Sequence, residues 1–226
     1  MEDYFSLTHA SLLDGVTQLT GFDLELAGVV ALYGPPPLWD REPGFATLIY
    51  IILEQQVSLA SARAAYTRLV EALGVVTPEG FLKLDDAALK TIGFSRQKTA
   101  YGRHLARAVA GGALDLEGLS RLPDDAVRVE LIKLKGIGRW TADIYLMEAL
   151  LRPDVWPNGD LALASAVKQV KRLDTLPGPD ELLALGEAYR PWRSVAARLF
   201  WHYYLSTPGQ KNRAAAQGQL PGEAAG

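Results

Sequence analysis

Apolar residues recur along most of this chain every three or four positions, which is the periodicity of an amphipathic α-helix. The pattern is regular over residues 45–73, 99–110, 161–170 and 180–189. Residues 1–33 are predicted to form a lead segment and one helix. No stretch shows the sustained alternation of a β-strand, and no internal repeat is present. The pattern therefore predicts an all-α fold with many short helices.

Two further amphipathic segments, residues 124–133 and 140–151, are separated by a tight turn that reads Leu-Lys-Gly-Ile-Gly-Arg. Glycines at 136 and 138 allow φ > 0 and let another backbone approach closely. Amide groups just before a helix N-terminus favour an anion, and Lys135 and Arg139 add positive charge. A turn that binds one DNA phosphate and an ordinary helix–helix turn both fit this stretch.

Composition and charge narrow the possible classes of protein. The chain has 226 residues, 49% of them hydrophobic, which is enough for one large domain or two small lobes. The formal net charge is −3, so any affinity for DNA must come from local basic patches and should be sensitive to salt. No apolar run is long enough to span a bilayer and the N-terminus lacks a signal-peptide pattern, so we expect a cytoplasmic protein.

The absence of cysteine excludes disulfides, thiolate zinc sites, cysteine nucleophiles and a cysteine-held iron–sulfur cluster. The three histidines, at positions 9, 104 and 202, are scattered without metal-ligand spacing.

Three polar features have both a structural and a functional interpretation. Gln55 and Gln56 follow an apolar run and are expected either to cap a helix or to hydrogen-bond bases and fill a gap in a duplex. Asp160 precedes the helix over 161–170, where an N-cap is the simplest role. One helix face is basic and is either solvated or a binding surface; its residues are Arg96, Lys98, Arg103 and Arg107.

Several blocks together resemble a known family. Residues 134–142, followed by Trp-Pro-Asn-Gly-Asp at 156–160, are similar to the signature of helix–hairpin–helix DNA glycosylases, in which a Gly/Pro-rich loop and a single aspartate follow the hairpin. The Gln-Gln-Val-Ser block at 55–58 fits the same family. The Pro-Trp-Arg-Ser segment at 191–194 resembles the AlkA-type 3-methyladenine DNA glycosylase II branch. The resemblance runs from about residue 40 to about 205.

The resemblance implies two α-helical lobes with a cleft between them. Residues 41–153 would form the lobe that holds the hairpin, at 134–140. Residues 1–40 and 154–205 would form the second lobe. Independently of the resemblance, the Gly, Ala, Gln and Pro content of residues 206–226 predicts a disordered tail. About 40 leading residues are too few for the extra N-terminal domain of the AlkA form, so a compact version is expected.

The implied activity is monofunctional DNA glycosylase activity in base excision repair. The enzyme would flip out alkylated bases of the 3-methyladenine type and related N-alkylpurines and release them by hydrolysis. Asp160 would stabilise the positive charge that develops on the sugar. Trp140 stands where strand-cutting members carry a lysine nucleophile, so no AP lyase activity is expected.

The resemblance also assigns binding residues. Trp140 and Trp201 match the aromatic walls of the base pocket, although core packing is the alternative for each. Ile144 stands where a third aromatic residue is expected, which leaves the range of lesions open. Gln56 matches the side chain that wedges into the duplex. The expected DNA-binding residues are Gln55, Gln56, Lys135, Gly136, Gly138, Arg139 and Thr141.

No cofactor is expected to be required. A structural Na⁺ or K⁺ at the hairpin is implied through the main-chain carbonyls of Ile132, Leu134 and Ile137. The expected partner is double-stranded DNA that contains alkylated bases, with no membrane, and the protein is expected to be a monomer.

Two other functions are compatible with parts of the sequence. A non-catalytic helix–hairpin–helix protein that binds damaged DNA would have no use for Asp160, because a carboxylate facing DNA is repelled. A glycosylase for a neutral base would need a second acid. Asp143 and Asp154 lie nearby in the sequence, but solvation or capping explains both more simply.

Overall fold

The computed structural model describes residues 5–207, which form twelve α-helices and one 3₁₀ turn and contain no strand. The all-α prediction is therefore confirmed over this range. The helices are α1 (His9–Phe22), α2 (Leu24–Tyr33), α3 (Phe45–Glu54), α4 (Leu59–Leu73), α5 (Pro78–Lys83), α6 (Asp86–Ile92), α7 (Arg96–Ala110), α8 (Asp124–Ile132), α9 (Arg139–Glu148), α10 (Leu161–Val170), α11 (Pro179–Glu187) and α12 (Arg193–Ser206), with η1 (Gly118–Arg121) before α8.

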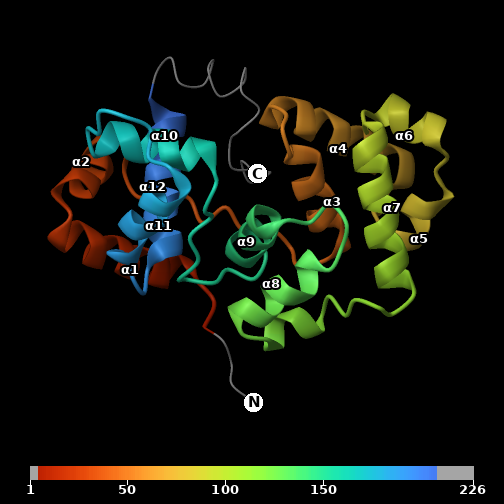
Figure 1. The fold of residues 1–226 in the computed structure, drawn as a ribbon, viewed down its shortest axis with the longest axis horizontal. Coiled ribbons are helices and arrows are strands. Elements are labelled where there is room, and N and C mark those ends of the chain that lie inside the picture. Colours follow the sequence, from red (N-terminus) through yellow and green to blue (C-terminus); the bar gives the residue numbers. More distant parts are fainter. Residues whose placement is uncertain (1–4, 208–226) are drawn as a thin grey trace.

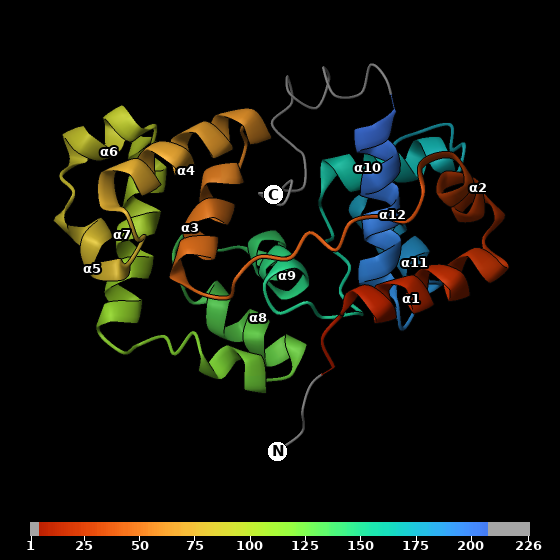
Figure 2. The same ribbon diagram turned by 180° about the vertical axis from the view of Figure 1, so that it is seen from behind.

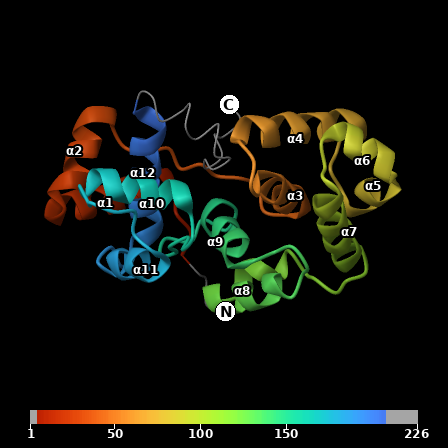
Figure 3. The ribbon, with the colours of Figure 1, turned by 45° about the horizontal axis from the view of Figure 1, so that its top comes forward.

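The helices lie in two groups with α8 and α9 between them (Figures 1 and 2). On one side α12 packs against α10, α2 and α1, and on the other α3 packs against α4, α7 and α9. Residues 34–44, called the connector below, run from α2 in the first group to α3 in the second (Figure 2). In Figure 3 the central helix α9 lies between α10 and α3.

The N-terminal region differs from the prediction, because it forms two helices rather than one. Asp23 separates them: its side chain accepts the backbone N–H of Leu26 and so begins α2. The same carboxylate pairs with Lys171 and accepts the hydroxyl of Tyr189. The predicted tail at 206–226 lies outside the described residues except for positions 206 and 207, which belong to the end of α12.

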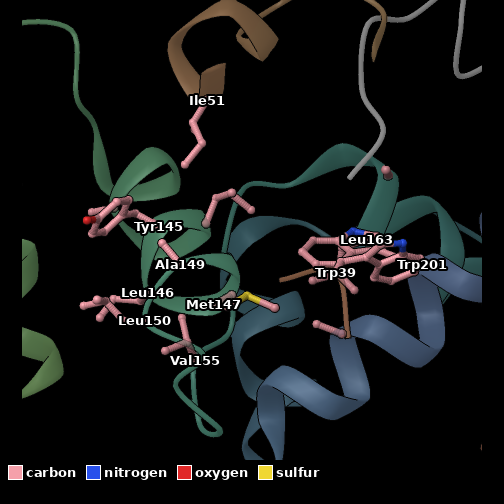
Figure 4. Close-up of a cluster of buried hydrophobic side chains, with 14 of the residues drawn as sticks. Trp39, Ile51, Tyr145, Leu146, Met147, Ala149, Leu150, Val155, Leu163 and Trp201 are labelled. Carbon is pink, nitrogen blue, oxygen red and sulfur yellow. The ribbon is translucent and has the colours of Figure 1, made fainter. Parts of the chain in front are cut away.

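The core runs through the centre of the molecule. Residues 141–148 of α9 are all buried, as expected for a helix that is surrounded by others. Figure 4 shows Tyr145, Leu146 and Met147 of this helix together with Trp39 and Trp201, which belong to the same buried cluster. Within residues 5–207, no helix has the length and apolar character needed to cross a membrane.

Candidate active site

Asp160 lies at the N-terminus of α10, after the loop that follows α9. Its backbone is extended, and its Oδ1 accepts the N–H of Leu163 at 2.7 Å. The expected N-cap is therefore present. Only 8% of the residue is exposed, so this carboxylate lies in a largely dry environment.

Two indole rings hold the carboxylate in place. Trp140 Nε1–H donates to Asp160 Oδ2 at 2.9 Å, and Trp201 Nε1–H donates to Oδ1 at 3.3 Å. The structure thus brings together the three residues to which the sequence assigned catalysis and base binding. Trp140 is half-buried, whereas Trp201 is 1% exposed and packs in the core. Their role as pocket walls stays a prediction.

Burial raises the pKa of Asp160 above its ordinary value, because the charged form loses its contact with water. The N–H groups of Leu163, Trp140 and Trp201 act in the opposite direction, since each donates to the ionised form. The N-terminal end of α10 also favours a negative charge at this position.

The hairpin lies between the end of α8 and the start of α9. Gly136 has φ +96°, and a Cβ there would overlap the ring of Tyr101, so only glycine fits. Gly138 has φ −94°, and nothing lies within 4 Å of the position that its Cβ would take. Of the two glycines, Gly136 uses the positive φ that both allow, whereas the open side of Gly138 leaves room in front of α9.

The hairpin places positive charge beside the start of α9, and the anion site itself stays a prediction. Gly138 is the N-cap of α9 and offers no side chain to its first-turn N–H groups, which such helix ends leave unpaired. Lys135 and Arg139 are exposed beside them. Arg139 also approaches Asp143, with Nε 3.8 Å from Oδ2.

The two glutamines have different environments. Gln55 Nε2 donates to the carbonyl of Gly136 at 2.9 Å and to Thr141 Oγ1 at 3.0 Å. Thr141 is 2% exposed. These two side chains brace the hairpin against the end of α3. The contact with DNA that is expected of them stays a prediction. Gln56, by contrast, is exposed and has φ +57°.

The carbonyls assigned to a monovalent cation surround the same turn. Leu134 O accepts the N–H of Ile137 at 3.0 Å, and Ile132 is the last residue of α8. Carbonyl oxygens are ligands that hard cations accept. Among residues 5–207 no group of His, Cys, Asp or Glu could hold a metal ion. The main-chain site stays a prediction.

The environments of Asp143 and Lys98 differ from those predicted, whereas that of Asp154 agrees in part with the prediction. Asp143 is fully buried and accepts Arg128 Nε at 2.6 Å, so neither solvation nor capping explains it. Asp154 accepts both the backbone N–H and the Nε of Arg193, and the capping explanation therefore holds in part. Lys98 turns away from the basic face of α7, and its Nζ donates to Leu53 O at 2.6 Å.

Four charged residues that are buried or nearly buried were not predicted from the sequence: Arg41, Glu54, Glu148 and Arg198. A signal was present, because Glu148 and Arg198 are single charged residues within apolar helical runs. Such residues are almost never buried unless they are paired.

The comparisons with known proteins agree with this geometry. Residues 49–191 match the model of the HhH-GPD superfamily base excision DNA repair protein family. DNA-3-methyladenine glycosylase 1 of Schizosaccharomyces pombe is 28% identical over 200 residues, which are 82% of this chain and 88% of that protein. Two Bacillus subtilis relatives are longer, and this chain spans only about half of each. YfjP is 34% identical over 66% of this chain and 55% of its own length. A DNA-3-methyladenine glycosylase is 31% identical over 70% of this chain and 56% of its own length.

Solved structures share the fold. The S. pombe 3-methyladenine DNA glycosylase Mag1, in complex with abasic DNA, superimposes with a TM-score of 0.77 at 26% identity and covers 87% of this chain and 98% of its own. A Bacillus halodurans DNA-3-methyladenine glycosidase gives a TM-score of 0.68 at 30% identity, over 89% and 91% of the two chains. Since the family model spans more than half of the sequence, this chain belongs to the HhH-GPD superfamily of base excision DNA repair proteins.

Proposed function

We propose that this protein is a monofunctional DNA glycosylase that excises alkylated bases, of the 3-methyladenine type and related N-alkylpurines, from double-stranded DNA. One observation carries the proposal: the buried carboxylate of Asp160 is held by the indole N–H groups of Trp140 and Trp201. The names of the relatives, several of which are DNA-3-methyladenine glycosylases, support the same substrate class.

In the proposed reaction the bond between C1′ and the base nitrogen breaks first, and the bonding electrons leave with the base. A base made cationic by alkylation departs as a neutral molecule, so no general acid is required. The sugar becomes positive, and the carboxylate of Asp160 stabilises it. Water then adds to C1′ and loses its proton to the solvent, which leaves an abasic site.

The strand is expected to stay intact. A lyase would need an amine that forms a Schiff base with the opened sugar, and Trp140 supplies none at the relevant position. The product is therefore an abasic site in an unbroken strand.

DNA is proposed to bind across the hairpin. The first-turn N–H groups of α9 behind Gly138, together with Lys135 and Arg139, would receive one phosphate. Gln56, exposed on the turn after α3, would enter the space left by the flipped base. A Na⁺ or K⁺ ion held by the carbonyls of Ile132, Leu134 and Ile137 would complete the phosphate site.

The first experiment measures base release from duplex DNA treated with a methylating agent. We expect methylated purines in solution, abasic sites in the DNA, and strand breaks only after heat or alkali. Untreated duplex is the control and should release nothing. Binding to methylated DNA without release of any base would contradict the proposal and favour the non-catalytic binder.

The pH dependence of excision is a second prediction. The active form of Asp160 is the carboxylate, and burial raises its pKa above 3.8. Lowering the pH through this raised pKa protonates the group, so the single-turnover rate should already fall at a pH above that at which an exposed aspartate titrates. The rate is measured from about pH 4 to pH 8, with spontaneous depurination subtracted. A rate that stays constant down to about pH 4 would contradict the assignment.

A further inference from the structure

Arg41, in the connector, contacts the last residues of two helices at once. Its NH1 and NH2 donate to Glu54 Oε2 and Oε1 at 3.1 and 2.8 Å, and its Nε lies 2.8 Å from Glu148 Oε2. Its backbone N–H also donates to the carbonyl of Glu148 at 2.8 Å. One residue thus joins the C-terminal ends of α3 and α9.

These three side chains are buried together. Their exposed fractions are 11% for Arg41, 5% for Glu54 and 1% for Glu148, and the guanidinium lies 4.6 Å from the centre of the Tyr50 ring. Burial raises the pKa of Glu54 and raises that of Glu148 to about 7. Loss of Arg41 would remove the cation that pairs directly with both buried carboxylates and leave Glu54 with the attraction of Lys98 and Glu148 with that of Arg198. Breaking a buried ion pair in this way is destabilising for the present arrangement of the two carboxylates.

Arg198 of α12 ties the same region to the other group of helices. Its Nε donates to Leu38 O at 2.8 Å and its NH2 to Met147 O at 2.6 Å. The connector is therefore bound to α12 at residue 38 and to α3 and α9 at residue 41. Through residues 38–41 of the connector, these contacts hold the two groups of helices in a fixed relative position.

The end of α3 is also the start of the turn that presents Gln56 to the solvent. Glu54 immediately precedes Gln55, whose amide is bound to the hairpin. At the other end of α9, Trp140 contacts Asp160. A single rigid helix therefore runs from the carboxylate site to Glu148, and Arg41 connects that helix to the turn of Gln56.

We propose that Arg41 is a positioning residue, which holds the turn of Gln56 at a fixed distance from Asp160 so that both act on the same nucleotide. This inference rests on the proposed glycosylase function. Arg41 touches no substrate and acts through Gln56. Its contribution concerns extrusion of the base from a duplex and not cleavage of the bond.

The test compares a methylated duplex with the same methylated strand without its complement, which needs no wedge. In Arg41→Gln the single-turnover rate on the duplex should fall about tenfold or more, because the wedge is no longer aligned with the site. The rate on the single strand should stay within about twofold of that of the unmodified protein. Arg121→Gln removes an exposed arginine that lies 3.8 Å from Asp115 and has no proposed role in binding, so it serves as the matched control.

Two further variants separate positioning from loss of fold. Arg41→Lys keeps the charge but cannot pair with Glu54 through two parallel hydrogen bonds, and it should show the same selective loss to a smaller degree. Gln56→Ala should reproduce the loss on duplex DNA, and the double variant with Arg41→Gln should be no slower than Gln56→Ala alone. Equal losses on both substrates, or additive losses in the double variant, would overturn the inference. If the unmodified protein excised bases from neither substrate, the proposed function itself would be refuted.

Discussion

Replacement of Asp160 by asparagine is expected to lower the rate of base excision by roughly 10²- to 10³-fold, the effect typical of removing one electrostatic stabiliser of a transition state. The substitution removes the negative charge that faces the positive sugar and changes the volume little. Single-turnover excision from methylated duplex DNA measures the effect. Binding to DNA should survive or improve, because the variant no longer places a carboxylate beside phosphates.

The fold should tolerate this change. Asparagine caps a helix about as well as aspartate does, so the hydrogen bond to the N–H of Leu163 can be kept. The amide NH₂ would, however, face the indole N–H of Trp140, which now donates to Oδ2. Trp140→Phe is therefore the matched control, since it removes that donor and leaves the charge. A variant Asp160→Asn that excises bases at close to the normal rate would show that this carboxylate is not catalytic.

Much of the fold follows from local sequence signals. Residues 161–170 are predicted and observed as a helix, and Asp160 caps it as its position suggests. The hairpin is equally local, because Gly136 and Gly138 interrupt an amphipathic pattern on both sides. Asp23 shows the limit of such signals: the apolar pattern continues across it, and its capping hydrogen bond splits one predicted helix into two.

Contacts between distant segments could not be predicted in this way. Arg41 lies 107 positions before Glu148 in the chain, and nothing local indicates that the two side chains meet in the interior. Solvation or capping was expected for Asp143 for the same reason, although its carboxylate is buried and pairs with Arg128. The family resemblance assigned Asp160, Trp140 and Trp201 to one site, and the structure brings these three side chains together. Among the buried charges, Glu148 and Arg198 were visible only as lone ionisable groups in apolar runs.

The two hairpin glycines should respond very differently to alanine. In Gly136→Ala the new Cβ would overlap the ring of Tyr101 at a residue with φ +96°. The left-handed backbone costs about 1–2 kcal/mol and the overlap about 1–3 kcal/mol more. We therefore expect the free energy of unfolding to fall by roughly 2–5 kcal/mol, measured by denaturant titration, together with a marked loss of affinity for DNA.

Gly138→Ala is the matched substitution two residues away. Its backbone suits any residue and its Cβ meets nothing within 4 Å, so stability should change by only about 0.5 kcal/mol. The methyl group would nevertheless stand in front of the α9 N–H groups that are proposed to bind a phosphate. Affinity for duplex DNA, measured by fluorescence anisotropy, should therefore fall while the fold stays intact. If Gly138→Ala binds DNA as tightly as the unmodified protein, the phosphate does not approach the hairpin at this glycine, and the anion site must lie elsewhere on the protein.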